Sequence, residues 1–535
     1  MSFNTNQHLD FIVSLMSNWY NIYNPVLLGL QKYEPNDTLS QMGIIQKQGT
    51  RSSIFLFIGF CIGGINTIFL FPKFFTQAEY GLTRALVDTA TILSVLATLG
   101  TTPVIYKFYP FYKSHVKSQK NDLPFITGLI CLAGFLLICL AGYIFKDFII
   151  RKLGKSPLFA AHFYLVYPFT FLMLAYTWME AFGWSFKKTV TTNFLKETLV
   201  RILTTALIIL VWAGLIDKER FITLFSCIYL LPVVILLFVL IKTHEWKFNF
   251  NISHVTKRFK GKMITFGLFI FGASFLNIAS RTVDTFMIIG IKGLEKTAVF
   301  TIASYLVAFM DLPVRSLTSI ATPILAESWK EKNYANILNI YTKSTVTLLV
   351  AGLFIYLMVL LNIKNLVSFL SNDWAEVPLV VLIMGFAKLI DLGTGVNGQL
   401  IGTSSNWRFD FFTNVLLTLM AFPLNFFMIT HFGIIGAAFS NLIAISIYNA
   451  VRFGFIYKKY GWQPYGFAHV KVLLISLILF LGVYAIPFMV NIYIDTIFRA
   501  VLFAGLFIPA MLRMNVSEEF NAVAKNVIKK TLRRR

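Results

Sequence analysis

Residues 123–145 read LPFITGLICLAGFLLICLAGYIF, a run with no charged side chain. A helix needs about 20 mostly apolar residues to cross the hydrocarbon core of a bilayer. Windows of this kind recur along the whole chain, some with one or two charges inside them. The sequence therefore predicts an all-α integral membrane protein of about fourteen transmembrane helices, near 52–71, 82–106, 123–145, 158–182, 193–214, 221–241, 263–290, 297–321, 338–361, 377–400, 410–430, 433–457, 471–490 and 495–513.

The composition agrees with a protein whose main solvent is lipid. Hydrophobic residues make up 57% of the chain and charged residues 13%, and the mean hydropathy is +0.71. Soluble domains have about 45–50% apolar and about 25% charged residues. The four cysteines lie in apolar stretches without CxxC spacing, and no phosphate-binding GxxxxGK[ST] motif occurs. We therefore predict no metal site, no cofactor and no ATP hydrolysis by this chain.

The net charge of +23 comes mainly from short segments between the apolar windows. This pattern argues against nucleic-acid binding and is typical of the cytoplasmic side of a multi-pass protein in a bacterial inner membrane. With fourteen helices, both termini are predicted to be cytoplasmic. One outer loop, 146–157, opposes this topology because it carries four cations. The basic segments on the predicted cytoplasmic side are 107–122, 242–262, 458–471 and the C-terminal tail.

A weak internal repeat predicts the domain organisation. The first two helices end at Thr102-Pro103, and the seventh and eighth end at Thr322-Pro323, each before a cytoplasmic loop. Because six helices separate the copies, they have the same orientation and form a parallel repeat. The predicted parts are an N-terminal cytoplasmic extension (1–41), a six-helix N-lobe (42–257), a six-helix C-lobe (258–457), two further helices (458–515) and a basic cytoplasmic tail (516–535). Met42 is an alternative start.

Charged pairs inside the predicted helices are the candidate functional residues. A charge near the bilayer centre costs about 2.5–3.5 kcal/mol on insertion scales, so it usually faces a cavity or a partner. One interpretation is that each pair only neutralises itself. The other is a charged, water-filled cavity, which we favour because helices that face lipid would not carry four such pairs. The pairs, each on one helical face, are Arg84/Asp88, Arg281/Asp284, Asp311/Arg315 and Lys388/Asp391.

The sequence resembles a known family in several short stretches. These are GIIQKQG at 43–49, NTIFLFPKF at 66–74, EYGL at 79–82, and Arg281-x-x-Asp284 followed by Ile289-Gly290. Together with the plan of six, six and two helices, they resemble the polysaccharide transporters of the multidrug/oligosaccharidyl-lipid/polysaccharide flippase superfamily. The nearest likeness is to O-antigen-type flippases of Bacteroidetes-like bacteria, over about residues 42–515.

The resemblance implies a flippase that moves an undecaprenyl-pyrophosphate-linked oligosaccharide across the inner membrane by alternating access. Expected partners are this substrate, membrane lipids, and the glycan polymerase and glycosyltransferases of the same pathway, with the protein itself a monomer. Arg281, Arg315 and Lys388, then Arg84, are the expected substrate-binding cations. Cavity acids of drug-exporting relatives couple ions, which makes Asp284 and Asp391, with Asp311 and Asp88, the matching candidates here.

Three other functions stay open at this point. Two are transport functions of the same superfamily, namely multidrug or cation antiport and flipping of the peptidoglycan precursor. The third is a membrane-embedded glycan polymerase, which would need catalytic residues in a large outer loop. No predicted loop exceeds roughly 20 residues, so there is no room for a folded catalytic domain. We therefore predict a protein that is not an enzyme and has no catalytic residues.

Overall fold

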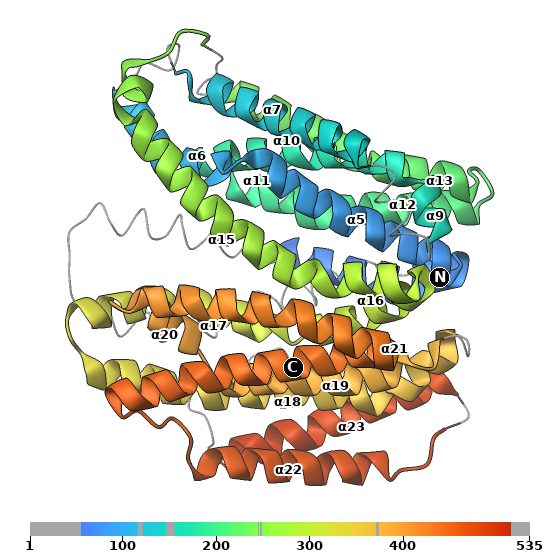
Figure 1. Cartoon of the computed structure of the whole chain (residues 1–535). Coiled ribbons are helices and arrows are strands. Elements are labelled where there is room, and N and C mark those ends of the chain that lie inside the picture. Colours follow the sequence, from blue (N-terminus) through green and yellow to red (C-terminus); the bar gives the residue numbers. More distant parts are fainter. Residues whose placement is uncertain are drawn as a thin grey trace, which may run out of the picture. The chain divides into compact units, whose positions relative to one another are not determined.

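The computed structural model describes residues 55–115, 121–145, 156–243, 246, 249–370, 374–489 and 491–514, and these residues form helices and connecting segments only (Figure 1). They divide into two compact units. The N-terminal unit holds residues up to Ile302 together with Thr418–Ala437. The C-terminal unit holds Ala303–Leu417 and the residues from Ala438 onward. The predicted extension 1–41, most of loop 146–157 and the tail 516–535 lie outside the described residues.

The N-terminal unit begins with a spanning helix, Phe55–Phe74, that contains the π-helical stretch η1 (Ile65–Leu70) and ends with α4 (Phe71–Phe74). A capping box at Thr76 and Glu79 starts the next helix, since each side chain accepts a backbone N–H of the other residue. The following elements are α5 (Gln77–Thr98), α6 (Thr101–His115), α7 (Leu123–Ile144), α9 (Pro157–Ala161), η3 (Phe163–Leu165), α10 (Val166–Ser185), α11 (Thr189–Asn193), η4 (Phe194–Leu199), α12 (Val200–Trp212), α13 (Lys218–Ser226), α14 (Leu230–Lys242) and α15 (His254–Lys292). The first half of α16 (Leu294–Ala308) also belongs to this unit.

The C-terminal unit continues from α16. Its further helices are α17 (Asp311–Lys330), α18 (Tyr334–Leu370), α19 (Val377–Gly393), α20 (Asn397–Thr403), the two ends of α21 (Trp407–Tyr460), α22 (Phe467–Tyr484) and α23 (Ile492–Arg513). The chain bends by 46° between α19 and α20. Gly395 lies in this bend with a φ of +66°, and a side chain there would collide with Ser344 and Thr345 of α18. Glycine is therefore required both by the backbone and by the close approach of α18.

Helix α21 is two antiparallel helices joined at Gly433, whose φ of 64° and ψ of −143° are not helical. Side-chain contacts between its two halves establish the antiparallel course. Phe409 stacks on Phe455 at 3.9 Å between ring centroids, and the Asn406 amide donates to the Tyr460 hydroxyl over 2.7 Å. The two predicted windows 410–430 and 433–457 thus correspond to the two arms of one tight hairpin.

Each of the fourteen predicted windows overlaps one or more helices of the described residues, although several windows also include turns, such as 99–100, 227–229 and 394–396. By length and hydropathy, seven of the described helices can cross a membrane, or ten if each of three bent pairs counts as one span. Helix α15 alone has 39 residues, or about 58 Å at about 1.5 Å per residue, so it exceeds the hydrocarbon core of about 30 Å. The predicted all-helical, multi-pass membrane protein is confirmed, whereas the number fourteen and the lobe boundaries stay predictions.

Candidate functional site

Lys388 lies between two carboxylates in the C-terminal unit. Its Nζ is 2.6 Å from Asp311 Oδ1 and 3.0 Å from Asp391 Oδ2. Lys388 and Asp391 share one face of α19, whereas Asp311 comes from the first turn of α17. The lysine side chain is only 20% exposed, and both acids are partly exposed. This group, called here the Lys388 triad, links two helices and has one more carboxylate than cations.

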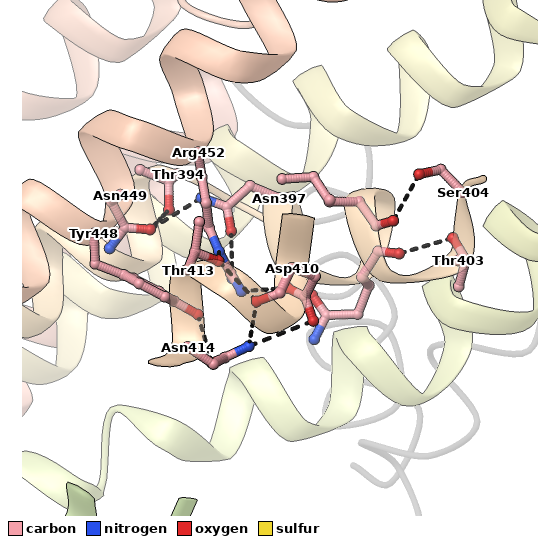
Figure 2. Close-up of polar contacts among 12 residues, drawn as sticks. Thr394, Asn397, Thr403, Ser404, Asp410, Thr413, Asn414, Tyr448, Asn449 and Arg452 are labelled. Carbon is pink, nitrogen blue, oxygen red and sulfur yellow. Dashed lines mark hydrogen bonds and ion pairs between the residues drawn. The ribbon is translucent and has the colours of Figure 1, made fainter. Parts of the chain in front are cut away.

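The second oxygen of Asp391 connects the triad to Asn449 of α21. Asp391 Oδ1 accepts from Asn449 Nδ2 over 3.2 Å. The Asn449 carbonyl oxygen in turn accepts from Thr394 Oγ1 and from Asn397 Nδ2, both at 2.9 Å (Figure 2). Thr394 and Asn397 flank the bend between α19 and α20. The break in the helix therefore supplies two donors to an asparagine that is almost completely buried.

Arg452, one turn beyond Asn449, is the centre of the buried part of the network. Its Nε donates to Thr413 Oγ1 over 3.0 Å, its Nη2 forms an ion pair with Asp410, and its guanidinium lies 4.0 Å from the centroid of the Tyr448 ring. Figure 2 shows these side chains converging from both arms of α21, beside Asn397 of α20. A guanidinium in this fork of acceptors is held in one orientation. Arg452 is only 5% exposed.

We define the C-unit network as the Lys388 triad and the polar residues that continue from it. It comprises Asp311, Lys388, Asp391, Thr394, Asn397, Asp410, Thr413, Asn414, Tyr448, Asn449 and Arg452. Three carboxylates face two basic side chains, so the fully ionised network carries one net negative charge. Such an arrangement favours the uptake of a further small cation, a proton or a metal ion, over the binding of an anion. No group of three His, Cys, Asp or Glu side chains suited to a metal occurs among the described residues.

The N-terminal unit holds separate charged groups. Arg84 Nε lies 2.8 Å from Asp88 Oδ2 on α5, and the aspartate is the more deeply buried partner. Asp284 of α15 accepts from Asn425 Nδ2 over 2.5 Å. Two further ion pairs of this unit, Lys196–Glu180 at 2.9 Å and Arg201–Glu197 at 3.0 Å, involve the π-helical stretch η4, and Lys218 pairs with Glu79 over 2.7 Å.

Residues 51–329 match the family model described as polysaccharide biosynthesis protein. This match covers more than half of the chain. The protein belongs to the polysaccharide biosynthesis protein family. The predicted resemblance to polysaccharide transporters is thus confirmed. A comparison with curated proteins by sequence gives no match.

Solved structures extend the likeness beyond the family match. This member of the polysaccharide biosynthesis family is similar to a lipid II flippase, MurJ, in an inward closed conformation, with a TM-score of 0.65 and 16% identity over 86% of this chain and 98% of that one. It is also similar to an outward-facing multidrug resistance MATE family transporter (TM-score 0.54, 12% identity, 76% and 94% covered) and to a transporter of the same superfamily from Pyrococcus furiosus (TM-score 0.53, 11% identity, 76% and 94% covered). At these identities the likeness shows the fold. It is a fold of transporters and flippases, which agrees with the prediction of a protein that is not an enzyme.

The structure brings together three of the eight predicted site residues, namely Asp311, Lys388 and Asp391. The sequence spacing places Asp311 and Arg315 on one face of α17, but in the structure Asp311 pairs with Lys388 of α19. Spacing along one helix allows an i,i+4 pair but says nothing about competition from another helix. Arg315 is exposed on α17. The side chain of Arg281 lies outside the described residues.

The remaining predicted residues form two contacts in the N-terminal unit. The Arg84–Asp88 pair is present as the spacing predicts, and Asp284 contacts Asn425. None of these contacts tests the predicted roles in substrate binding or ion coupling, which stay predictions.

Sequence reasoning missed Asp410, Asn449 and Arg452. A signal was available, because Arg452 lies well inside the window 433–457 and an intramembrane arginine needs a partner. Asp410 lies at the edge of its window, 42 residues earlier, so only the hairpin at Gly433 reveals that the two residues meet.

Proposed function

We propose that this protein is a flippase that moves an undecaprenyl-pyrophosphate-linked oligosaccharide across the bacterial inner membrane by alternating access, without covalent chemistry. Family membership supports a role in polysaccharide biosynthesis, and the shared fold supports transport. The observation that carries the proposal is the Lys388 triad, continued by the C-unit network, within helices of a membrane protein. The triad is partly exposed and has one more carboxylate than cations, and an ionisable group of this kind within a membrane protein is a functional-site candidate by default.

The proposal includes fourteen spans, two six-helix lobes and cytoplasmic termini. Because α21 is a hairpin of two antiparallel arms, we count it as two spans. The apolar helices and the three bent pairs supply the other spans, and three more are needed to reach fourteen. These would be helix α10, the combined segment of α11, η4 and α12, and helix α15. The positive-inside rule supports the orientation.

Within this flippase, Arg315 is the preferred contact for the pyrophosphate. Lys388 is already shared by two carboxylates, so an anionic headgroup would have to compete with both of them. Arg315 is exposed one turn after Asp311, and a guanidinium can bind two phosphate oxygens at once. Arg281 and Arg84 remain the further candidates from the sequence.

The Lys388 triad is the preferred element for ion coupling. A proton or sodium ion on Asp311 or Asp391 would remove part of the attraction that holds Lys388 between α17 and α19. Because Asp391 also accepts from Asn449, the same event would change the contacts of α21. Asp284 with Asn425, and Asp88 with Arg84, are the corresponding candidates in the N-terminal unit.

The test replaces the arginine and measures the surface glycan. Arg315→Ala should reduce glycan display at least tenfold at unchanged protein level, because a charge-assisted phosphate contact is worth about 1.5–3 kcal/mol. Lys330→Ala removes an exposed cation from the far end of the same helix and should leave display intact. Normal display in a double Arg281→Ala, Arg315→Ala variant would contradict the proposed pyrophosphate contact.

Peptidoglycan-precursor flipping is the second candidate, favoured by the fold shared with the lipid II flippase. The two functions separate in a complementation experiment. Rescue of cells depleted of their lipid II flippase, with no change in surface glycan on deletion of this gene, would support the second candidate. A change in drug sensitivity alone would instead support drug export, the third function of this superfamily.

A further inference from the structure

A basic surface runs along the line where α6 meets α15 in the N-terminal unit. Lys107 Nζ lies 3.8 Å from the centroid of the Phe266 ring, and Arg258 and Lys262 lie within 6.0 Å of the Phe259 ring. Phe259 and Phe266 both lie on α15 and are two helical turns apart. The three cations and Phe111, Phe259 and Phe266 are called here the basic seam.

Aromatic contacts hold the two helices together beneath the cations. Phe108 of α6 lies 6.2 Å from Phe259 and 6.1 Å from Phe266, and Phe111 lies 5.4 Å from Phe259. On the inner side, the Tyr112 hydroxyl bonds Thr256 Oγ1. The base of the seam is therefore fixed, so its cations extend from a rigid aromatic surface.

No described acid neutralises these cations. Lys107, Arg258 and Lys262 are exposed, and none of them forms an ion pair within the described part of the chain. The nearby Asp122 is buried, and its Oδ2 accepts from the Ser253 backbone N–H over 2.7 Å and from Thr256 Oγ1 over 2.8 Å. Three positive charges thus remain available to an external anion.

The place of the seam in the chain distinguishes between kinds of anion. Together with α5, helix α6 forms one of the bent pairs that can cross a membrane, and Lys107 and Phe111 lie in the second half of this pair. Phe111 is 41% exposed, and on the other face of α15 Ile264 and Leu268 are 62% and 60% exposed. Cations at the end of an apolar helix lie at the level where phosphate headgroups meet acyl chains in a bilayer. A phospholipid is held at this level, whereas a soluble phosphate is not.

We propose that the basic seam binds an anionic phospholipid, with its phosphate headgroup on Lys107, Arg258 and Lys262. Charge complementarity selects this occupant over a neutral lipid, and the place of α6 in a candidate membrane span selects it over a soluble anion. The site is independent of which substrate the protein transports.

Native mass spectrometry of the full chain in detergent micelles tests the proposal with phosphatidylglycerol and phosphatidylcholine of identical acyl chains. Phosphatidylglycerol should bind at least tenfold more tightly. Each cation near a membrane surface contributes about fivefold in affinity, so the Lys107→Gln, Arg258→Gln, Lys262→Gln variant should lose the preference. A matched control places Gln at three exposed lysines of the C-terminal unit, Lys330, Lys458 and Lys471. It removes the same amount of charge and should keep the preference for phosphatidylglycerol.

Two further variants distinguish a loss of lipid binding from a loss of folding. Lys107→Arg with Lys262→Arg keeps the charge and should keep the preference. Lys262→Gln alone, at an exposed position, should weaken phosphatidylglycerol binding about fivefold. Equal binding of both lipids by the unmodified protein would overturn the proposal, as would an equal loss in the control. It would also fail if undecaprenyl pyrophosphate, and not phosphatidylglycerol, lost its binding in the triple variant.

Discussion

Two ion-pair groups of the C-terminal unit differ in how completely they are satisfied. Arg499 and Asp495 of α23 are 0% and 1% exposed, and their Nε–Oδ2 distance is 2.7 Å. Arg499 also donates to the carbonyl oxygens of Val483 and Ile486, and Asp495 also accepts from Asn365 Nδ2 and the Met489 backbone N–H. Lys388, in contrast, is partly exposed and has two acids for one ammonium.

The difference supports a structural role for the Arg499–Asp495 pair and the proposed ion-coupling role for the Lys388 triad. The Arg499–Asp495 pair balances its charge and fastens the segment between α22 and α23 to α18, so nothing in it is left to bind a ligand. The Lys388 triad keeps an excess carboxylate within reach of the surface. An enclosed, balanced pair indicates a structural role, and an accessible, unbalanced one indicates a site whose occupancy can change.

The largest expected effect comes from breaking the enclosed pair. Arg499→Ala leaves a buried carboxylate without its cation, which should lower the free energy of unfolding by about 3–5 kcal/mol. Thermal unfolding in detergent measures this loss. The double variant Arg499→Met, Asp495→Leu should recover most of the stability, because it removes both charges together. If it is as unstable as the single variant, the pair has a role other than neutralising its own charge.

An intermediate effect is expected at the triad. Lys388→Met should reduce transport at least tenfold, because the two acids lose the cation that holds α17 to α19. Stability should fall by less than in Arg499→Ala, since the triad is partly exposed and water can solvate the freed carboxylates. Lys388→Arg is the matched control and should retain part of the activity. The comparison fails if Lys388→Met loses stability but its remaining folded molecules transport normally.

A smaller effect is expected where the triad joins the C-unit network. Asn449→Leu removes the donor to Asp391 and the acceptor of Thr394 and Asn397, at about 1–3 kcal/mol for the unpaired polar groups. Transport and unfolding are measured together with Lys388→Met in a double-mutant cycle. A coupling energy near zero would show that the triad and Asn449 act independently.

The smallest effect is expected at Arg84, which is more exposed than Lys388 and pairs within its own helix. Arg84→Gln keeps an amide donor for the buried Asp88 carboxylate and should lower the free energy of unfolding by less than Arg499→Ala does, because Arg84 itself is partly exposed. The measurement is again thermal unfolding, beside surface glycan display. A loss of surface glycan display without a loss of stability would contradict a purely structural role for Arg84 and support its role in substrate binding.

Hydrophobicity made the helices predictable, whereas the site depended on pairings between them. A spanning helix can be recognised from the sequence because about 20 local residues must be apolar, so each predicted window overlaps helical residues of the described chain. Lys388 and Asp391 were also predictable, since both lie on α19. Asp311 with Lys388, and Asp410 with Arg452, come from different helices. Their meeting depends on packing that no spacing along one helix encodes, and a single sequence does not determine it.

The reversal at Gly433 sets the register of the hairpin on which Arg452 depends. Asp410 and Arg452 face each other because 22 residues precede the glycine and 18 follow it between them. One inserted residue would rotate the second arm by about 100° and shift it by about 1.5 Å. Such an insertion, although at the far tip of the hairpin, would turn Arg452 and Asn449 away from their partners. The length of this small turn is thus as strictly constrained as the identity of the charged residues.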